Sequence, residues 1–188
     1  MKQQIPNALT ILRFLLVPLF LYFLFVSVNE QRSWIVLTVF IVAAFTDYLD
    51  GMLARKYNVI SDFGKIMDPL ADKLLVLSAL SGLCWLPPFY LSRVIFFIIL
   101  ARELLITILR EVYQKRGIVV AADKLGKLKT VMQMLGIIVA LFFWAAQNEV
   151  AVWLIQTVSI WFWMVAAITV ISGFNYLRVL GKKETSHA

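Results

Sequence analysis

Long apolar stretches occupy most of this 188-residue chain, and their length limits what it can fold into. Hydrophobic residues make up 62% of the sequence, whereas a soluble globular domain usually contains about 45–50%. Crossing the hydrocarbon core of a bilayer takes about 20 apolar residues in a helix. We therefore predict an all-α, polytopic membrane protein with six transmembrane helices. The six stretches are Leu9–Val28, Trp34–Ala54, Pro69–Leu86, Phe89–Arg110, Thr130–Ala146 and Ala151–Leu177.

The connectors between these stretches are short, so residues 1–188 are expected to form a single membrane domain. A short polar tail, residues 181–188, would end this domain, and we expect the tail to be frayed. The first apolar stretch is too long for a signal peptide and lacks a small-residue cleavage site, so we interpret it as a retained helix.

The basic residues are distributed unevenly among the connectors. With the N-terminus in the cytoplasm, the inner connectors hold most of the lysines and arginines, whereas the opposite side holds Arg32 and Arg93. This is the bias expected of a membrane protein in that orientation, and an even number of helices puts both termini in the cytoplasm. Four tryptophans then fall near the outer interface, namely Trp34, Trp85, Trp144 and Trp153.

The formal net charge of +7 suggests an anionic membrane surface and anionic substrates. A nucleic-acid-binding protein would need a basic face on a soluble fold, so nucleic acid is not an expected partner. Cys84 is the single cysteine, which excludes an internal disulfide, and we expect it to be buried as a small hydrophobic residue. The single histidine, His187, lies in the polar tail. Catalysis by a histidine base, a cysteine nucleophile or a Cys/His zinc site is therefore not expected.

The segment FTDYLDGMLARKYNVISDFGKIMDPLADKLL, which spans the junction of two apolar stretches, contains five aspartates, and four of them fall in one frame. Charged groups in or beside a bilayer are costly and usually functional. Neighbouring carboxylates also repel one another, and a divalent cation would keep them ionised. The segment has the frame Asp-x2-Asp-Gly-x2-Ala-Arg-x8-Gly-x3-Asp-x3-Asp, which comprises Asp47, Asp50, Gly51, Ala54, Arg55, Gly64, Asp68 and Asp72.

The spacing of the frame predicts two helices. Residues 47, 50, 51 and 54 repeat as one face of a helix, and residues 64, 68 and 72 share a face of the next helix. Gly51 and Ala54 would let a ligand approach closely, and Arg55 is well placed for phosphate. Two antiparallel helices joined near Lys56–Phe63 could bring the four acids together. We therefore predict an all-oxygen cation site at the cytoplasmic edge of the membrane.

Each part of the frame also has a purely structural interpretation. Asp68 could cap a helix in which Pro69 is the first residue. Asp72 could pair with the lysine that follows it, and Gly51 and Ala54 could serve helix packing. One frame that contains all eight positions favours a shared site over these separate explanations.

The frame matches the signature of the CDP-alcohol phosphatidyltransferases at every position. These are integral-membrane enzymes that exchange the CMP of a CDP-linked substrate for an alcohol. The signature covers 26 residues, and the six-helix layout extends the resemblance over nearly the whole chain. The resemblance implies two divalent metal ions, Mg²⁺ or Mn²⁺, held by Asp47, Asp50, Asp68 and Asp72, with Asp72 also acting as general base.

The resemblance also implies a pocket for CDP-diacylglycerol. Its residues would be Gly51, Ala54, Arg55, Ser61 and Gly64 from the frame and Asn7 and Thr10 from the N-terminal segment IPNALTILR. Without the resemblance, Asn7 and Thr10 would be an ordinary turn and cap.

A second polar segment, ARELLITILREV, interrupts the fourth apolar stretch, and the lysine-rich DKLGKLKT follows. Glu103 could simply pair with Arg102 or with another helix, and the lysines could mark the cytoplasmic side. The alternative is an anion pocket for a phosphate carried by the acceptor alcohol. This arrangement is similar to that of the phosphatidylglycerophosphate synthases, a branch of the family whose acceptor is glycerol 3-phosphate. The pocket would consist of Arg102, Arg110, Lys127 and Lys129.

The resemblance implies transfer of a phosphatidyl group from CDP-diacylglycerol to glycerol 3-phosphate. The expected setting is a homodimer in a bacterial cytoplasmic membrane, with the active site facing the cytoplasm. Other acceptors remain possible within the family, giving cardiolipin, a phosphatidylinositol phosphate or phosphatidylserine. Intramembrane acids could also line a divalent-cation transport path. The absence of an internal repeat and the position of the acids toward one face argue against transport.

Overall fold

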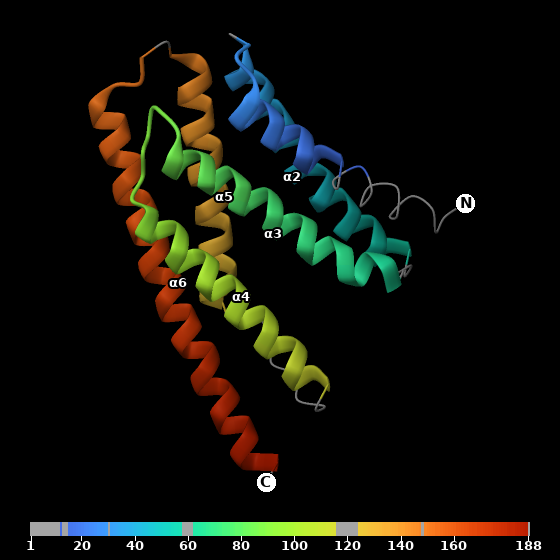
Figure 1. Ribbon diagram of the computed structural model, residues 1–188. Helices are drawn as coiled ribbons and strands as arrows, with labels where there is room; N and C mark the ends of the chain where they lie inside the picture. Colours follow the sequence, from blue (N-terminus) through green and yellow to red (C-terminus); the bar gives the residue numbers. More distant parts are fainter. Residues whose placement is uncertain are drawn as a thin grey trace. The chain divides into compact units, whose positions relative to one another are not determined.

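The computed structural model describes residue 12 and residues 15–29, 31–57, 62–115, 124–147 and 149–187. Within these ranges, it describes the backbone alone for residues 47–51, 53–57, 62–70, 72, 115, 124 and 182–187. The described residues form helices and short connectors, and no strand occurs among them (Figure 1). The prediction of an all-α fold is therefore confirmed for this part of the chain.

The helices coincide with the apolar stretches. Residues 15–26 are helical and end in the π-helix η1 (Tyr22–Val26). The α-helices that follow are α2 (Arg32–Tyr57), α3 (Asp62–Trp85), α4 (Arg93–Lys115), α5 (Lys124–Ala146) and α6 (Val152–His187). Each predicted stretch overlaps one of these helical segments, because a run of about 20 apolar residues can satisfy its backbone in a bilayer only as a helix.

Two helix ends differ from the predictions. Helix α3 begins at Asp62, so Pro69 lies inside the helix and Asp68 is not its N-cap. The structural interpretation of Asp68 as a cap was therefore wrong. Helix α6 continues to His187, so the tail expected to be frayed is helical through that residue. Lysine and glutamate in the tail are good helix formers, and extending an existing helix requires no new nucleus.

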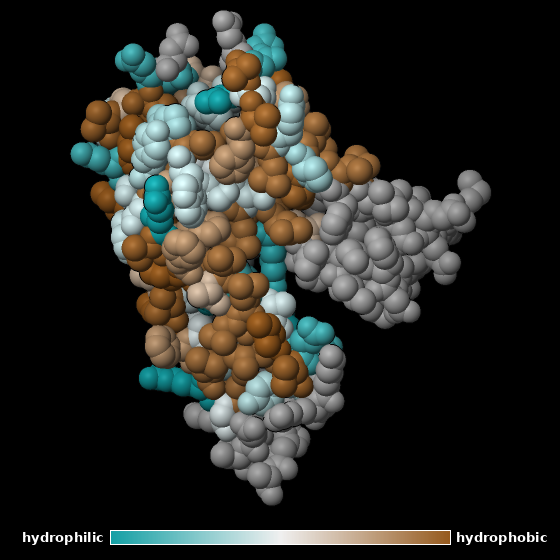
Figure 2. All heavy atoms as spheres, viewed as in Figure 1, coloured by the Kyte–Doolittle hydropathy of each residue, from teal (hydrophilic) through white to brown (hydrophobic). Residues whose placement is uncertain are grey.

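Two helical segments among the described residues are long and apolar enough to cross a membrane, Leu125–Ala146 and Val152–Gly181. Shorter apolar helical segments are Leu15–Val26, Arg32–Thr46 and Lys73–Trp85. Figure 2 shows apolar side chains over much of the visible surface. Phe45, Phe97 and Phe174 are each more than half exposed. Apolar surface on this scale is typical of contact with lipid or protein. The number of spans and the orientation of the termini stay predictions.

The chain divides into two compact units, and the first comprises Met1–Pro88 and Ile137–Val150. In this unit α2 packs against η1 and against α3. Phe20, in the first helical segment, and Phe40 of α2 are fully buried, and their ring centroids are 5.9 Å apart. Cys84 of α3 is buried as predicted. Apolar packing thus holds the helices that carry the aspartate frame.

The second unit comprises Phe89–Gly136 and Ala151–Ala188, and in it α4 packs against α6. A buried cluster of Ile106, Tyr176 and Leu180 joins the two helices. Apolar contacts therefore hold α4 against α6.

Helices α5 and α6 also interlock within the second unit. The indole Nε1–H of Trp161 donates a hydrogen bond to the carbonyl oxygen of Met132 at 2.9 Å. A Cβ atom added at Gly136 would lie only 2.6 Å from the same indole nitrogen. Glycine at position 136 therefore leaves the space that the tryptophan ring occupies.

Candidate functional site

The aspartate frame lies on two neighbouring helices. Its first five positions, from Asp47 to Arg55, are on α2, and its last three, from Gly64 to Asp72, are on α3. The helices contact each other and run side by side in opposite directions (Figure 1). The predicted pair of antiparallel helices is therefore present.

The four aspartates of the frame lie at similar distances from the joined ends of α2 and α3. Asp47 lies ten residues before the end of α2, and Asp72 lies ten residues after the start of α3. Asp50 and Asp68 lie seven and six residues from the same two ends. At about 1.5 Å of rise per residue, these distances are about 15 Å for the first two and about 10 Å for the others. Each aspartate of α2 therefore has a counterpart on α3 at a similar distance along the helix from the joined ends.

The chemistry of this donor set fits a hard divalent cation. Aspartate supplies only oxygen ligands, and the frame contains no cysteine or histidine. Carboxylate oxygens suit Mg²⁺ and Mn²⁺, whereas zinc sites usually contain nitrogen or sulfur ligands. Among the side chains that the structure describes, no group of three or more histidines, cysteines, aspartates or glutamates could hold a metal. The side chains of the four aspartates lie outside that set.

The residues predicted for the CDP-diacylglycerol pocket are only partly described. Gly51, Ala54 and Arg55 lie on α2, and Gly64 lies in the first turn of α3. The two helices that carry them are neighbours. The remaining three residues, Asn7, Thr10 and Ser61, lie outside the described residues.

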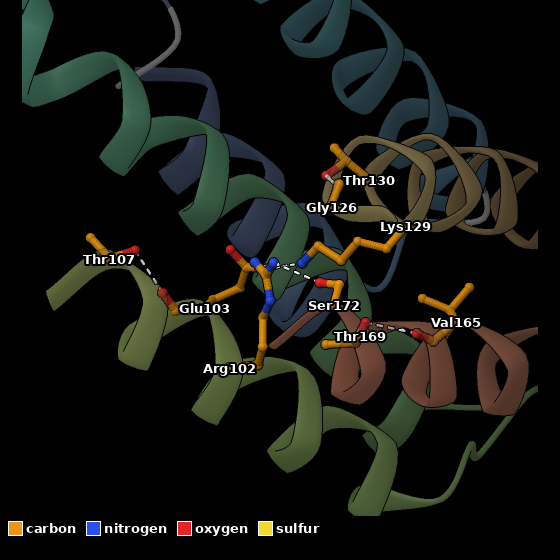
Figure 3. A network of polar contacts seen from close by, with 9 residues as sticks. All are labelled: Arg102, Glu103, Thr107, Gly126, Lys129, Thr130, Val165, Thr169 and Ser172. Carbon is orange, nitrogen blue, oxygen red and sulfur yellow. Dashed lines mark hydrogen bonds and ion pairs between the residues drawn. The ribbon is translucent and has the colours of Figure 1, made fainter. Parts of the chain in front are cut away.

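A polar network joins three helices in the second unit (Figure 3). The Oε1 atom of Glu103 on α4 forms an ion pair with the Nζ atom of Lys129 on α5. The same oxygen lies 3.4 Å from Nη1 of Arg102, also of α4. Arg102 in turn donates a hydrogen bond from Nη2 to the Oγ atom of Ser172 of α6 at 2.8 Å. One carboxylate oxygen therefore contacts two cations.

This network is largely withdrawn from solvent. The side chain of Lys129 is 4% exposed, and those of Arg102 and Glu103 are each 15% exposed. Added Cβ atoms at Gly126 and Gly173 would lie 3.5 Å from Nη2 and Cγ of Arg102, so its side chain passes close to both glycines. A guanidinium fork and an ammonium group held together in this way suit an oxyanion.

The other two residues of the predicted anion pocket lie differently. Arg110 of α4 and Lys127 of α5 are exposed. They take no part in the contacts that join Arg102, Glu103, Lys129 and Ser172. The structure thus brings two of the four predicted cations together. Glu103 pairs both with the adjacent Arg102 and with Lys129 of another helix, so both pairings considered from the sequence are present.

Ser172 was missed by the sequence analysis. It is fully buried, and its hydroxyl oxygen accepts a hydrogen bond from Arg102. An isolated serine in an apolar helix carries no local signal, because its partner lies 70 residues away in sequence. Only the packing of α4 against α6 reveals it.

Comparison with known proteins decides the family. The family model described as CDP-alcohol phosphatidyltransferase matches residues 3–178. The chain belongs to the CDP-alcohol phosphatidyltransferase family. This confirms the resemblance drawn from the frame between Asp47 and Asp72. Members of this family generally use divalent metal ions, which agrees with the oxygen-rich donor set on α2 and α3.

Individual relatives match this CDP-alcohol phosphatidyltransferase over most of its length. A protein of Rickettsia typhi is 32% identical over 176 residues, which cover 94% of this chain and 96% of that protein. A protein of Bacillus subtilis is 34% identical over 186 residues, covering 92% and 93%. Both are named CDP-diacylglycerol–glycerol-3-phosphate 3-phosphatidyltransferase. A probable phosphatidylglycerophosphate synthase of Mycobacterium tuberculosis H37Rv is 36% identical over 178 residues, covering 93% and 80%.

Proposed function

We propose that this chain transfers the phosphatidyl group of CDP-diacylglycerol to glycerol 3-phosphate, in the biosynthesis of anionic phospholipids. The observation that carries the proposal is the similarity, over almost the full length, to bacterial proteins named for this activity. The buried cations of α4 and α5 support the choice of an acceptor that carries a phosphate.

The four aspartates are assigned to the metal site and to proton transfer. Asp47, Asp50, Asp68 and Asp72 would hold two divalent cations, Mg²⁺ or Mn²⁺. When bound, the cations would neutralise the diphosphate and stabilise the departing CMP. The similar distances of the aspartates from the joined ends of α2 and α3 support a shared site. Gly51 and Ala54 leave room for the cytidine diphosphate, and Arg55 binds its phosphate.

The remaining residues of the nucleotide-lipid pocket are assigned by resemblance. Gly64 and Ser61 complete the contacts to the cytidine diphosphate, and Asn7 and Thr10 contribute from the N-terminal segment. The acyl chains of CDP-diacylglycerol enter from the surrounding bilayer, whereas the cytidine and the acceptor arrive from water.

The transfer itself needs one proton acceptor. Asp72 takes the proton from the 1-hydroxyl of glycerol 3-phosphate. The hydroxyl oxygen bonds to the phosphorus that carries diacylglycerol, and the bond from this phosphorus to the bridging oxygen of the diphosphate breaks. CMP leaves with that oxygen and its electron pair. The products are phosphatidylglycerol phosphate and CMP.

The acceptor phosphate is assigned to the basic residues of α4 and α5. Arg102 and Lys129 bind it directly, since Glu103 holds their charged groups close together. Ser172 fixes the plane of the guanidinium through its hydrogen bond. The exposed Arg110 and Lys127 attract the anion from the surface.

We place the enzyme in a bacterial cytoplasmic membrane as a six-span homodimer. Both termini and the aspartate site face the cytoplasm in this arrangement. The apolar surface of the described helices and the basic bias of the predicted inner connectors support it.

The decisive experiment is an acceptor screen. Purified protein in detergent is given CDP-diacylglycerol and Mg²⁺, and CMP release is followed with glycerol 3-phosphate, inositol phosphate, serine or phosphatidylglycerol. We expect release above the acceptor-free rate only with glycerol 3-phosphate. Release with another alcohol would overturn the acceptor assignment. No release with any acceptor, from protein that is folded and metal-loaded, would overturn the transferase itself.

A further inference from the structure

A polar cavity lies at the start of α2, fifteen residues from the nearest aspartate of the frame, which is about 22 Å along the helix. Its volume is about 440 Å³, and ligand sites usually have about 300–1,000 Å³. None of its lining residues belongs to the aspartate frame or to the basic network of α4 and α5. The lining residues are Gln31, Arg32, Ser33, Trp34, Trp144, Ala145 and Gln147.

Arg32 is held in place at this cavity. Its Nη1 atom donates a hydrogen bond to the carbonyl oxygen of Ser27 at 3.3 Å. Its Cζ atom lies 5.4 Å from the ring centroid of Trp144, within the range of a cation–π contact. A guanidinium group has five N–H donors. Among the described residues, one donor of Arg32 is used, in the hydrogen bond to the carbonyl oxygen of Ser27. Donors therefore remain for a ligand at a fixed position.

The described lining of the cavity contains one charged side chain, Arg32, and no aspartate or glutamate. Gln31, Ser33 and Gln147, whose side chains can donate hydrogen bonds, also line the cavity. Arginine is the side chain best suited to bind phosphate through two parallel hydrogen bonds. An anionic phosphate group is therefore the ligand chemistry that this wall fits.

The edge of the cavity is apolar and aromatic. Trp34 lines the cavity and contacts the ring of Phe142 edge-on, with a centroid distance of 6.4 Å. Both rings are about half exposed. Tryptophan at a helix end is typical of the interface between membrane and water. A free phosphate ion would not use this apolar edge, whereas the glycerol and upper acyl chains of a lipid would.

We propose that this cavity binds the phosphate headgroup of an anionic phospholipid at the outer face of the membrane. The proposal rests on the membrane orientation proposed above, in which the start of α2 is on the side opposite to the site of phosphatidyl transfer. Arg32 binds the headgroup phosphate, Trp144 holds the guanidinium, and Trp34 with Phe142 contacts the glycerol region.

The test is lipid binding to the full chain in neutral detergent, measured by native mass spectrometry with phosphatidylglycerol. Arg32→Gln removes the phosphate donor, and we expect it to weaken binding at least about tenfold. Arg93→Gln is the matched control, since Arg93 also begins a helix, is exposed and does not line the cavity. The control should stay within about twofold of the wild type. If phosphatidylglycerol were bound in the site of phosphatidyl transfer and not in this cavity, Arg32→Gln would still bind it.

Two further arms identify the ligand. Phosphatidylcholine should bind more weakly than phosphatidylglycerol, and millimolar inorganic phosphate should not displace the lipid. Equal binding by Arg32→Gln and the wild type, equal binding of the two lipids, or displacement by phosphate would each overturn the proposal. If Arg32→Gln does not fold, Arg32→Lys decides, because it keeps the charge but loses the planar fork and should still bind several-fold more weakly. The assay needs no turnover, so an inactive protein that binds phosphatidylglycerol through Arg32 would refute the transferase and not the cavity.

Discussion

Lys129 of α5 forms an ion pair with Glu103 of α4 while its own side chain is 4% exposed. A buried lysine is costly unless a carboxylate or another anion compensates its charge. Glu103 serves Arg102 in the same way through the same oxygen atom. The glutamate therefore compensates the charges of two neighbouring cations at this position.

Glu103→Gln tests this relationship. The amide keeps the shape of the side chain but removes the charge, so we expect unfolding to become easier by about 3 kcal/mol. Glycerol 3-phosphate brings a replacement anion, so it should raise the Tm of Glu103→Gln by more than it raises the Tm of the wild type. Differential scanning fluorimetry in detergent measures both shifts. Glu111→Gln, at an exposed position of the same helix, is the control. If glycerol 3-phosphate raised the Tm of Glu103→Gln and of the wild type equally, the acceptor would not bind at this network.

Lys129→Met and Lys127→Met separate direct binding from surface attraction. The lysines are two positions apart on α5, but Lys129 is buried in the network and Lys127 is exposed. We expect Lys129→Met to raise the KM for glycerol 3-phosphate at least about tenfold, because a charge-assisted hydrogen bond in a buried site is lost. Lys127→Met should raise it less than about threefold. The KM for CDP-diacylglycerol should change in neither variant. Similar effects of the two substitutions would contradict the assignment.

Gly136→Ala tests the contact between α5 and α6. The new methyl group would lie 2.6 Å from Nε1 of Trp161, whose position is fixed by its hydrogen bond to the carbonyl of Met132. We expect a loss of about 1–3 kcal/mol in the free energy of unfolding. Gly181→Ala is the matched control, because no atom lies within 4 Å of an added Cβ there. Alanine is the better helix former, so the control should be neutral or up to about 1 kcal/mol more stable. A thermal melt that ranks the two variants in the opposite order would mean that α5 and α6 do not interlock at Gly136.

The helices could be predicted from the sequence because each apolar stretch has the length of a helix that crosses a bilayer. The placement of Asp47 and Asp50 on one helix and of Asp68 and Asp72 on the next followed from their spacing. The start of α3 could not be predicted in the same way. Pro69 is a strong local signal for a first helical residue, yet the helix begins seven residues earlier, at Asp62.

Contacts between segments that are far apart in the chain could not be predicted from the sequence. The hydrogen bond from Arg102 to Ser172 depends on the packing of α4 against α6. No sequence pattern around either residue indicates its partner. The contact between Arg32 and Trp144 likewise depends on where the start of α2 meets the end of α5. Spacing within one helix is fixed by its geometry, whereas contacts across the chain depend on how side chains pack.

Asp72→Asn tests the general base. Asparagine keeps the size of the side chain but cannot accept the proton of the glycerol hydroxyl, so we expect turnover to fall by about a thousandfold. Binding of CDP-diacylglycerol should be largely kept, since the nucleotide contacts are assigned to other residues. Single-turnover CMP release measures the first effect, and equilibrium binding of labelled CDP-diacylglycerol measures the second. Near-normal turnover of the variant would show that another group accepts the proton.

Removing divalent metal tests the assignment of the aspartates. The four aspartates on α2 and α3 would supply only oxygen ligands, so EDTA should stop CMP release and Mg²⁺ or Mn²⁺ should restore it. Asp47→Asn removes one charged ligand, and we expect the Mg²⁺ concentration for half-maximal rate to rise at least about tenfold. Lys127→Met serves as the control, because it alters an exposed charge on α5 and no assigned ligand. If Asp47→Asn lost activity with an unchanged Mg²⁺ requirement, Asp47 would bind substrate and not metal. The metal ligands would then be the other three aspartates.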